Sequence, residues 1–274
     1  DVILLLLEEF GSGTQLPTPL KKLRPRLDTV YADLRNYQLT ARALRQARPD
    51  KVVHLAAVGV SDPFLNVNTA LSHNVTGTLN LVRACFESDG LDISQVVVAR
   101  TPGERTAMNV YAASKAAAWS FCEMYARTAG WPIHGAMIYQ AYGPGQPDHI
   151  LIPAAVHAAL AGQDFPMTDG SQQKDWIYID DVAAGILSLL NADLTPGTTV
   201  ELGSGEAVSV RDVVEQIYRI VDRGGQPLIG AIPGRPGEEP LQVADIERTA
   251  TLVEWRSSIG LANGLQLIVN SVVD

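Results

Sequence analysis

The first half of the chain alternates short apolar runs with segments of helical spacing. The runs are rich in β-branched residues and end in small or polar residues, which is typical of buried strands. Continuous apolar strands that alternate with helices predict βαβ units and a parallel sheet. The predicted strands cover residues 1–7, 51–57, 95–99 and 132–139, and the predicted helices cover 66–87 and 112–129.

The predicted helix 66–87 has apolar residues at helical spacing, which indicates one apolar face. These residues are Val67, Leu71, Val75, Leu79 and Val82.

After about residue 150 the pattern changes, because helices dominate and short strands lie between Gly- and Pro-rich turns. Predicted helices cover 151–161, 181–191 and 209–222, and the last opens with the Ser-x-x-Asp capping box of Ser209 and Asp212. We therefore expect a Rossmann-like, doubly wound parallel α/β domain over 1–150. A smaller mixed α/β lobe is expected over 151–274, interleaved with the first domain.

Composition narrows the class of protein further. A net charge of −9 argues against nucleic acid as a partner, since such proteins usually carry a basic face. The apolar run Val2–Leu7 is too short to span a bilayer and no basic segment precedes it, so neither a membrane anchor nor a signal peptide is expected. Cys85 and Cys122 fall in helical patterns without metal-ligand spacing and predict buried thiols. We expect a cytoplasmic protein without a metal site.

Candidate chemistry begins at Tyr111 and Lys115, which share one helix face because they lie four residues apart. An ammonium near a phenol favours the phenolate, so the pair predicts a lowered tyrosine pKa. Hydride transfer to or from a carbinol needs such a base, and Lys115 could also hydrogen-bond a ribose. The spacing also arises by chance, so the pair alone does not establish catalysis.

Three further segments fit a dinucleotide site. Residues 54–57, with sequence HLAA, end a strand in small residues that let a cofactor approach the backbone. The sequence NVTGT places Asn74 and Gly77 on the next helix. Asp33 follows a short strand, where its carboxylate could accept a hydrogen bond from an adenine amine.

Seven segments occur in the order that is typical of one family and cover about residues 30–265. They are ADLRN, HLAAVGVSDP, NVTGTLNLVRA, YAASKAAAW, YQAYGPGQ, TDGSQQKDWIYIDDVAAGI and GRPGEEPLQVADIERT. In these motifs the chain resembles the extended short-chain dehydrogenase/reductases that act on nucleotide sugars as epimerases or dehydratases.

The resemblance implies roles for individual residues. Tyr111 would be the general acid/base, Lys115 its partner and ribose anchor, and Thr101 the hydroxyl that polarises the substrate carbonyl. The smaller lobe would bind the nucleotide sugar. The residues expected around the dinucleotide are Asp33, Leu34, Leu55, Ala56, Ala57 and Asn74, besides Tyr111 and Lys115. The residues expected at the substrate are Gln140, Lys174, Arg235 and Glu238.

Two pieces of the family pattern are missing. The family begins with a strand and a glycine-rich phosphate loop, whereas this sequence starts on what resembles the second strand. The segment 11–17, GSGTQLP, is rejected as that loop because Pro17 and Pro19 would obstruct the following helix. Thr101 is followed by nine residues before Tyr111, less than the family's usual loop. We expect the intact protein to carry the missing pieces, and a mass above 29.4 kDa would support this.

The expected reaction passes through a 4-keto sugar, with a nucleotide-sugar 4-epimerase as the first choice. The 4,6-dehydratase is less favoured because the segment after residue 99 lacks a Thr-Asp-Glu run, and a 4-ketoreductase stays open. Glu8 or Glu9 would repel a 2′-phosphate, which favours NAD over NADP. The resemblance implies a homodimer formed through helices 66–87 and 112–129. The alternative from another class is a non-enzymatic sensor of the same fold.

Overall fold

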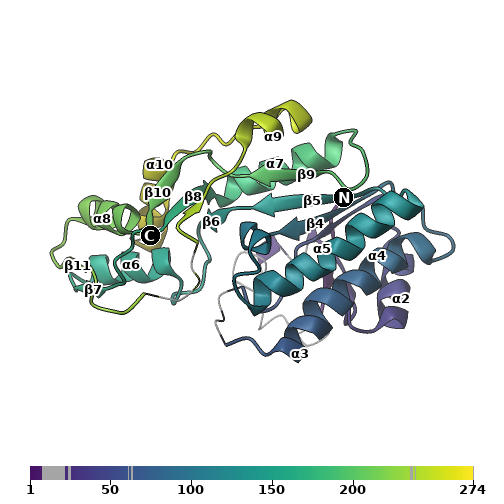
Figure 1. The fold of residues 1–274 in the computed structure, drawn as a ribbon, viewed down its shortest axis with the longest axis horizontal. Coiled ribbons are helices and arrows are strands. Elements are labelled where there is room, and N and C mark those ends of the chain that lie inside the picture. The colour runs from purple at the N-terminus through teal and green to yellow at the C-terminus, as the bar shows by residue number, and fades with distance from the viewer. Residues whose placement is uncertain are drawn as a thin grey trace. The chain divides into compact units, whose positions relative to one another are not determined.

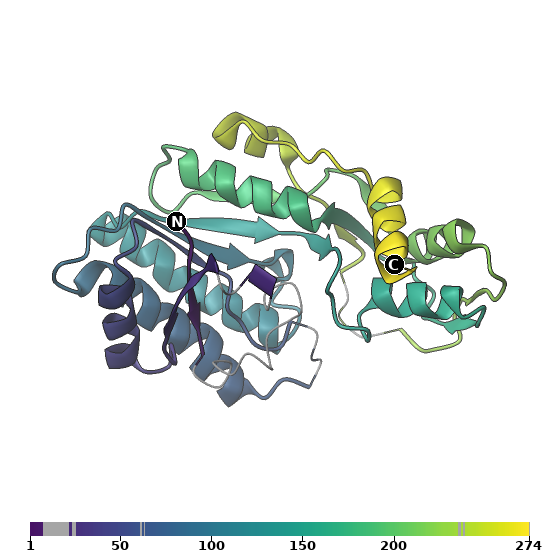
Figure 2. The same cartoon turned by 180° about the vertical axis from the view of Figure 1, so that it is seen from behind.

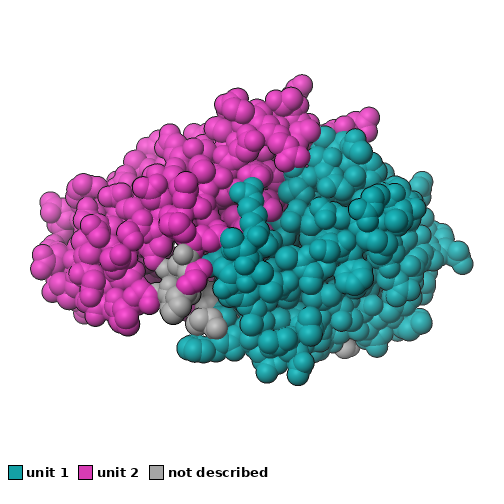
Figure 3. Space-filling view, viewed as in Figure 1, with its two compact units in different colours: residues 1–100, 104–135, 194–199 teal, residues 101–103, 136–193, 200–274 magenta. Residues whose placement is uncertain are grey.

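The structure is a computed structural model that describes residues 1–7, 22–23, 26–60, 62, 64–234, 237 and 239–273. The chain forms two compact units, and Figure 3 colours them separately. Unit 1 comprises residues 1–100, 104–135 and 194–199, and unit 2 comprises 101–103, 136–193 and 200–274. The assignment of a dinucleotide domain to 1–150 and a substrate lobe to 151–274 stays a prediction.

Unit 1 alternates strands with helices, as the apolar pattern predicts. Its elements are β1 (Ile3–Leu6), β2 (Asp28–Tyr31), α2 (Tyr37–Ala47), β3 (Lys51–His54), α3 (Val67–Ala70), the π-helix η3 (Leu71–Thr76), α4 (Gly77–Glu87), β4 (Gln95–Arg100) and α5 (Val110–Ala129). Helices α2, α4 and α5 lie side by side against the strands (Figure 1).

The strands pair in parallel, as predicted. β1 pairs with β2, in register from Ile3 opposite Asp28 to Leu6 opposite Tyr31. A separate sheet has the order β3-β4-β5-β9, in which Lys51 to His54 of β3 face Gln95 to Val98 of β4. β5 (Ile133–Ile138) and β9 (Thr199–Leu202) each begin in unit 1 and end in unit 2. The doubly wound α/β class is therefore confirmed.

The core of unit 1 lies between this sheet and the helices. Val82, Val96, Cys122 and Ile133 are fully buried in one apolar cluster. Cys85 and Cys122 are free thiols inside it, and burial raises the pKa of each to about 12. Both cysteines therefore serve packing.

Unit 2 contains shorter strands and helices of its own. Its elements are β6 (Gln140–Tyr142), α6 (Leu151–Leu160), β7 (Phe165–Pro166), β8 (Gln173–Tyr178), α7 (Ile179–Asn191), β10 (Ala207–Ser209), α8 (Val210–Val221), β11 (Pro227–Leu228), β12 (Leu241–Gln242), α9 (Ile246–Val253) and α10 (Leu261–Val273). β8 pairs with β6, β10 and β12, and helices α6, α8 and α10 pack around it (Figure 2).

The predicted capping of α8 by Ser209 is confirmed, but the reciprocal bond of Asp212 is made with the Ser209 hydroxyl and not with its backbone N–H. The Ser209 hydroxyl oxygen accepts a hydrogen bond from the Asp212 backbone N–H at 3.0 Å, while the hydroxyl donates to the Asp212 carboxylate at 2.6 Å. Val213, Val214 and Ile217 then pack into the core of unit 2. The cap and the apolar spacing act together, which explains why this helix could be predicted closely.

The predicted helix 66–87 is wrong in one respect, because a π-helix interrupts it. α3 begins after Asn66, η3 follows it without a break, and α4 starts at Gly77. A π turn holds more residues than an α turn, so the periodic pattern slips across it. Val67 and Leu71 are consequently exposed, whereas Val82 is buried. The slip also turns Asn74 inward, where it becomes part of the site described below.

Candidate functional site

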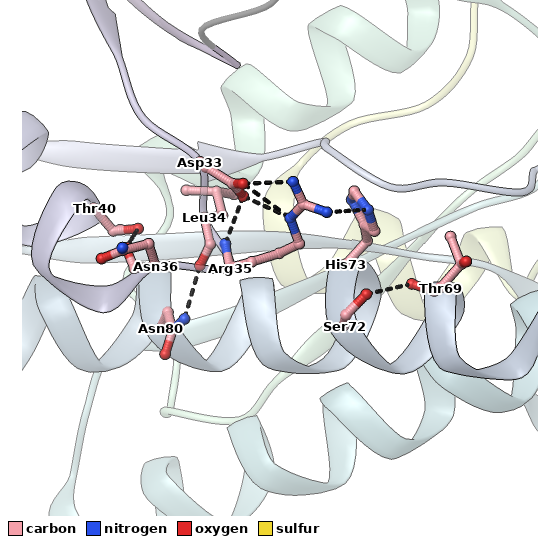
Figure 4. Close-up of polar contacts among 9 residues, drawn as sticks. All are labelled: Asp33, Leu34, Arg35, Asn36, Thr40, Thr69, Ser72, His73 and Asn80. Carbon is pink, nitrogen blue, oxygen red and sulfur yellow. Dashed lines mark hydrogen bonds and ion pairs between the residues drawn. The ribbon is translucent and has the colours of Figure 1, made fainter.

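Asp33 lies just beyond the carboxyl end of β2 and is held by Arg35. The Arg35 Nε donates to both carboxylate oxygens at 2.9 Å, Nη2 donates to Oδ2 at 2.6 Å, and the Arg35 backbone N–H donates to Oδ1 at 2.9 Å (Figure 4). These hydrogen bonds hold the pKa of Asp33 below its usual value. A ligand that hydrogen-bonds Asp33 must therefore share the carboxylate with Arg35.

Arg35 also links this corner to the π-helix. Its Nη1 lies 3.1 Å from Nε2 of His73 on η3 (Figure 4). Since a guanidinium can only donate, Nε2 of His73 is the acceptor in this contact. The Arg35 guanidinium thus links the loop after β2 to the π-helix η3.

Leu34, also expected at the dinucleotide, is fixed through its backbone. The Asn80 side chain on α4 donates to the Leu34 carbonyl at 2.8 Å. A Cβ on Gly77 would lie 3.4 Å from the Leu34 Cβ, which is close to an ordinary van der Waals contact. Gly77 thus lies next to the turn that holds Leu34.

The predicted strand 51–57 ends earlier than expected, at His54. Beyond it, Leu55 is 58% exposed and Ala56 is exposed as well. An exposed apolar residue next to small side chains at the carboxyl end of a parallel strand is where ligands of this fold class bind. Ala57 is half-buried in the same turn. This placement fits the expected contact with a dinucleotide.

The side-chain amide of Asn74 forms hydrogen bonds within the protein and is not directed at such a ligand. Its Oδ1 accepts from the Val58 N–H at 2.9 Å, and its Nδ2 donates to the Val58 carbonyl at 3.0 Å and to Ser114 Oγ at 2.9 Å. Ser114 Oγ in turn donates to the Tyr111 carbonyl at 2.7 Å. Asn74 therefore ties the loop after β3 to the helix that carries Tyr111 and Lys115.

Helix α5 begins at Val110, earlier than the predicted Ala112. Asn109 caps it by accepting from the Ala112 N–H at 2.8 Å. Tyr111 consequently lies in the first turn, and Lys115 stands one turn later. Lys115 is only 3% exposed. Over the part of the chain that the structure describes, neither the Tyr111 hydroxyl nor the Lys115 ammonium has a hydrogen-bond partner. The side chain of Lys115 is thus buried while its ammonium keeps unused donors for an acceptor.

The predicted lowering of the Tyr111 pKa is wrong. Burial of the phenol raises its pKa to about 12, and the negative charge of Glu104 adds to the rise. Burial also lowers the pKa of Lys115, while Glu104 opposes that change. The prediction was wrong because it considered only the positive charge of Lys115. It left out the desolvation of the buried Tyr111 phenol and the negative charge of Glu104, which lies in another segment.

That carboxylate belongs to the loop between β4 and α5, which Thr101 opens. Thr101 is half-buried and directly precedes the 3-10 helix η4 (Pro102–Arg105). Glu104 on η4 pairs with Arg100 at the end of β4. Sequence reasoning overlooked both residues, although the spacing of four between an Arg and a Glu was a usable signal.

In unit 2 the expected substrate residues have separate surroundings. Gln140 is exposed at the start of β6, opposite Trp176 of β8. Lys174 donates to the Gln242 Oε1 at 3.0 Å and to the Glu239 carbonyl at 3.2 Å, so its ammonium already braces β12 against β8. Arg235 and Glu238 lie outside the described residues, as do Glu8, Glu9 and residues 11–17.

Unit 2 also contains a cavity of about 200 Å³, lined among others by Trp176, Ser204, Glu206 and Ser258. Of the expected substrate residues that the structure describes, neither Gln140 nor Lys174 lines it. Neither a cluster of three or more His, Cys, Asp or Glu side chains suited to a metal ion nor a helix that could span a membrane occurs in the described ranges.

The geometry of unit 1 defines a class of protein. Parallel strands carry an acidic residue and small residues at their carboxyl ends, and a Tyr-x-x-x-Lys helix lies beside them. This combination is that of a Rossmann-fold nucleotide-binding protein.

Comparisons with known proteins narrow the class. The model of the NAD dependent epimerase/dehydratase family matches residues 12–203, which is more than half of the chain. The chain therefore belongs to this family, and the resemblance seen in the sequence is confirmed.

Individual relatives differ in activity. The dTDP-glucose 4,6-dehydratase of Xanthomonas campestris pv. campestris (strain B100) is 27% identical over 272 residues, covering 88% of this chain and 77% of that protein. The GDP-6-deoxy-D-mannose reductase of Pseudomonas aeruginosa is 29% identical over 243 residues, covering 81% and 80%. The crystal structure of UDP-glucuronic acid 4-epimerase from Bacillus cereus, in complex with UDP-glucuronic acid and NAD, has a TM-score of 0.83. It is 20% identical and covers 98% of this chain and 90% of that chain.

Proposed function

We propose that this protein modifies a nucleotide sugar through a 4-keto intermediate and that it is a 4-epimerase. The observation that carries the proposal is the pair on α5: a buried Lys115 whose ammonium has unused donors, one turn after a Tyr111 hydroxyl that has no partner in the described part of the chain. Family membership supplies the reaction class, because its NAD-dependent relatives include epimerases, dehydratases and reductases.

The residues of unit 1 fit a nicotinamide dinucleotide. Lys115 has donors for ribose hydroxyls, and the exposed turn at Leu55 and Ala56 leaves the backbone open to a ligand. An adenine amine that hydrogen-bonds Asp33 would share the carboxylate with Arg35, whose donors already make four contacts with it. NAD, when bound, supplies the hydride acceptor and donor. We propose NAD rather than NADP, and complexes with NAD among the structural neighbours support this choice.

Tyr111 carries the proton of the reaction. With its pKa raised to about 12, the phenol is protonated at neutral pH and can donate to a keto oxygen. To accept the proton of a sugar hydroxyl it needs a lower pKa, which positive charge beside it provides. The Lys115 ammonium is the chain's own source of that charge. Thr101 is proposed to polarise the carbonyl, and Gln140, Lys174, Arg235 and Glu238 to bind the nucleotide sugar.

One observation favours the epimerase over the dehydratase. A 4,6-elimination needs an acidic group that reaches the sugar. The described loop after β4 carries Glu104, but this side chain is buried and paired with Arg100. That pairing supports a 4-epimerase. The dehydratase is the second candidate, because the Xanthomonas relative has that activity and covers 88% of this chain.

The test begins with the cofactor. The purified protein is denatured and any released NAD or NADP is identified by mass spectrometry. The intact protein is then incubated with UDP-glucose, UDP-glucuronic acid and dTDP-glucose, and products are followed by NMR. An epimer of unchanged mass is expected. Loss of water from the sugar would replace the epimerase with the dehydratase, and absence of both cofactor and turnover would favour the sensor.

Variants of α5 assign the chemistry. Tyr111→Phe is expected to lower kcat by about 100-fold or more, because general acid–base catalysis contributes about 10²- to 10⁴-fold. Tyr125→Phe is the matched control, since Tyr125 lies on the same helix and stacks on Trp131 at 4.3 Å. Equal activity of Tyr111→Phe and the control would overturn the role of Tyr111.

A homodimer is proposed as well. Val67 and Leu71 on α3 and η3 and Phe121 on α5 are exposed apolar side chains on the helices expected to form it. Light scattering of the same purified sample gives the oligomeric state, and a monomer at micromolar concentration would contradict the dimer.

A further inference from the structure

Arg35 is an exposed arginine whose side chain is held in one place. The side chain is 41% exposed, yet its guanidinium lies between Asp33 and His73 (Figure 4). Nε and Nη2 donate to the Asp33 carboxylate at 2.6 to 2.9 Å, and Nη1 donates to Nε2 of His73 at 3.1 Å. A surface arginine gives up conformational entropy to keep one geometry. Here two anchors hold different atoms of the guanidinium, so its plane is fixed.

The two anchors come from different parts of unit 1. Asp33 belongs to the turn between β2 and α2, and His73 belongs to the π-helix η3. The next residue of η3, Asn74, is hydrogen-bonded to both backbone groups of Val58 in the loop after β3. η3 therefore joins the corner at Arg35 to the loop after β3. Both places lie beyond the carboxyl ends of parallel strands, where ligands of open α/β folds bind.

The contacts of Arg35 limit what it can bind. A guanidinium donates hydrogen bonds in its plane and stacks on rings through its faces. The edge formed by Nε and Nη2 is the one that grips a phosphate through two parallel hydrogen bonds, and here it is directed at Asp33. A phosphate would have to displace this carboxylate and lie beside its negative charge. Hydrogen bonds in the plane do not use the faces, so a flat aromatic ring suits this residue better than an anion.

A purine is the aromatic ring that the proposed cofactor brings to such a corner. In the proposed function Lys115 binds a ribose and the nicotinamide reacts beside Tyr111, so the adenine half needs a separate surface. A hydrogen bond from the adenine amine to Asp33 would compete with the four contacts that Arg35 makes there. Stacking on the guanidinium does not compete with them. Cations are attracted to the faces of aromatic rings, and bases stack on arginine planes in nucleic-acid complexes.

We propose that the guanidinium of Arg35 is the surface on which the adenine ring of the dinucleotide stacks, and that Asp33 and His73 fix its plane for this purpose. This inference rests on the proposed function, which supplies the dinucleotide. It adds Arg35 and His73 to the residues expected at the cofactor. It also gives Asp33 a further role, because the carboxylate holds the arginine that carries the ring.

The first test measures the affinity for NADH. The purified protein is freed of any bound dinucleotide and is titrated with NADH, whose nicotinamide fluorescence reports binding. Arg35→Ala is expected to raise the Kd of NADH by about 3- to 30-fold, because it removes a cation–π contact. A Kd within about 2-fold of that of the unmodified protein would overturn the inference, since this is less than the weakest contact of this kind contributes.

Arg83→Ala is the matched control. Arg83 is 43% exposed and pairs with Glu87 at 2.9 Å on the surface of unit 1, much as Arg35 pairs with Asp33. The control is expected to leave the Kd of NADH unchanged, and an equal loss in both variants would overturn the inference. Arg35→Lys keeps a positive charge beside Asp33 and serves if Arg35→Ala does not fold. It is expected to raise the Kd as well, because an ammonium has no planar face, and a Kd equal to that of the unmodified protein would contradict the stacking.

A second ligand separates stacking from a hydrogen bond that Asp33 would make. Reduced nicotinamide hypoxanthine dinucleotide keeps the purine ring and lacks the exocyclic amine of NADH. If Arg35 stacks on the ring, Arg35→Ala weakens binding of this dinucleotide by the same factor as binding of NADH. If Arg35 acts only by holding Asp33 for the amine, the substitution leaves the hypoxanthine dinucleotide unaffected. The first result is expected, and the second would overturn the inference.

The outcomes keep this inference apart from the proposed function. A loss of NADH affinity in Arg35→Ala, together with no turnover of any nucleotide sugar by the unmodified protein, would support the stacking role and overturn the proposed function. Turnover by the unmodified protein, together with an unchanged NADH affinity in Arg35→Ala, would do the reverse. A protein that binds neither dinucleotide would overturn both the stacking role and the NAD of the proposed function.

Discussion

Unit 1 contains two Arg–Glu pairs with the same spacing and nearly the same length. Arg83 and Glu87 pair on α4 at 2.9 Å, and their side chains are 43% and 34% exposed. Arg100 and Glu104 pair across the end of β4 and η4 at 2.8 Å, and their side chains are 14% and 2% exposed. The two pairs have the same spacing in the sequence, but only Arg83 and Glu87 are well exposed to solvent.

Burial changes what each pair does. The exposed pair is screened and contributes a few tenths of a kcal/mol, as surface helix pairs do. In the buried pair each charge is compensated by the other, and removing one partner of a buried ion pair is strongly destabilising. Arg83 also lies 5.3 Å from the centre of the Tyr37 ring, whereas Arg100 contacts both Trp119 and Thr199. Only the buried pair influences Lys115.

The largest expected effect comes from breaking the buried pair on its arginine side. Arg100→Met should lower the free energy of unfolding by about 3–5 kcal/mol, because it removes the ion pair that compensates the buried Glu104 carboxylate. Urea unfolding at neutral pH measures the change. The double variant Arg100→Met with Glu104→Gln should recover part of the loss, and a single-variant loss below about 1 kcal/mol would show that burial does not distinguish the two pairs.

The next prediction concerns the buried His54 and the pH dependence of the free energy of unfolding. Burial, with the Lys115 charge second, lowers the pKa of His54 from 6.5 to about 3. The unfolded chain therefore binds a proton below pH 6.5 that the folded protein binds only near pH 3. The free energy of unfolding should fall by about 1.4 kcal/mol for each pH unit as pH decreases through this window.

The contribution of His54 is the difference between the parent protein and His54→Asn, measured by urea unfolding at several pH values. Identical pH dependence in the two proteins would contradict the lowered pKa. Below pH 3 the two curves should run in parallel, because His54 is then protonated in both states.

The smallest expected effect is that of the exposed pair. Arg83→Met should change the free energy of unfolding by no more than about 0.5 kcal/mol, and less at high salt. The measurement is the same urea unfolding, with and without added salt. A loss of several kcal/mol would show that the exposed pair stabilises the fold as much as the buried pair, and it would contradict the comparison.

Much of the fold was predictable because it depends on local periodicity. The apolar runs of β3, β4 and β5, the helix α5 and the capping box of α8 all lie within two or three residues of their expected positions. The boundary errors arose where a neighbouring segment decided the outcome. α5 starts early because Asn109 caps it, and β3 stops at His54, which bonds Thr78 Oγ1 on α4 at 2.8 Å.

The candidate site was predictable in part for the same reason. The spacing of Tyr111 and Lys115, and the order of motifs around them, follow from the sequence alone. The use of Asn74 as a clamp did not, because its partners Val58 and Ser114 lie 16 and 40 residues away. The apolar pattern does not predict the π-helix η3, in which the Asn74 side chain is buried.

The sequence by itself determined the alternation of strands and helices, the family motifs and the face that pairs Tyr111 with Lys115. Only the tertiary structure decided which charges act on that pair, which carboxylate is buried and in which direction the pKa of Tyr111 moves. The physical reason is that spacing is a property of neighbours along the chain. Desolvation and Coulomb interaction depend on neighbours in space, and Arg100, Glu104 and Trp119 meet only after the chain has folded.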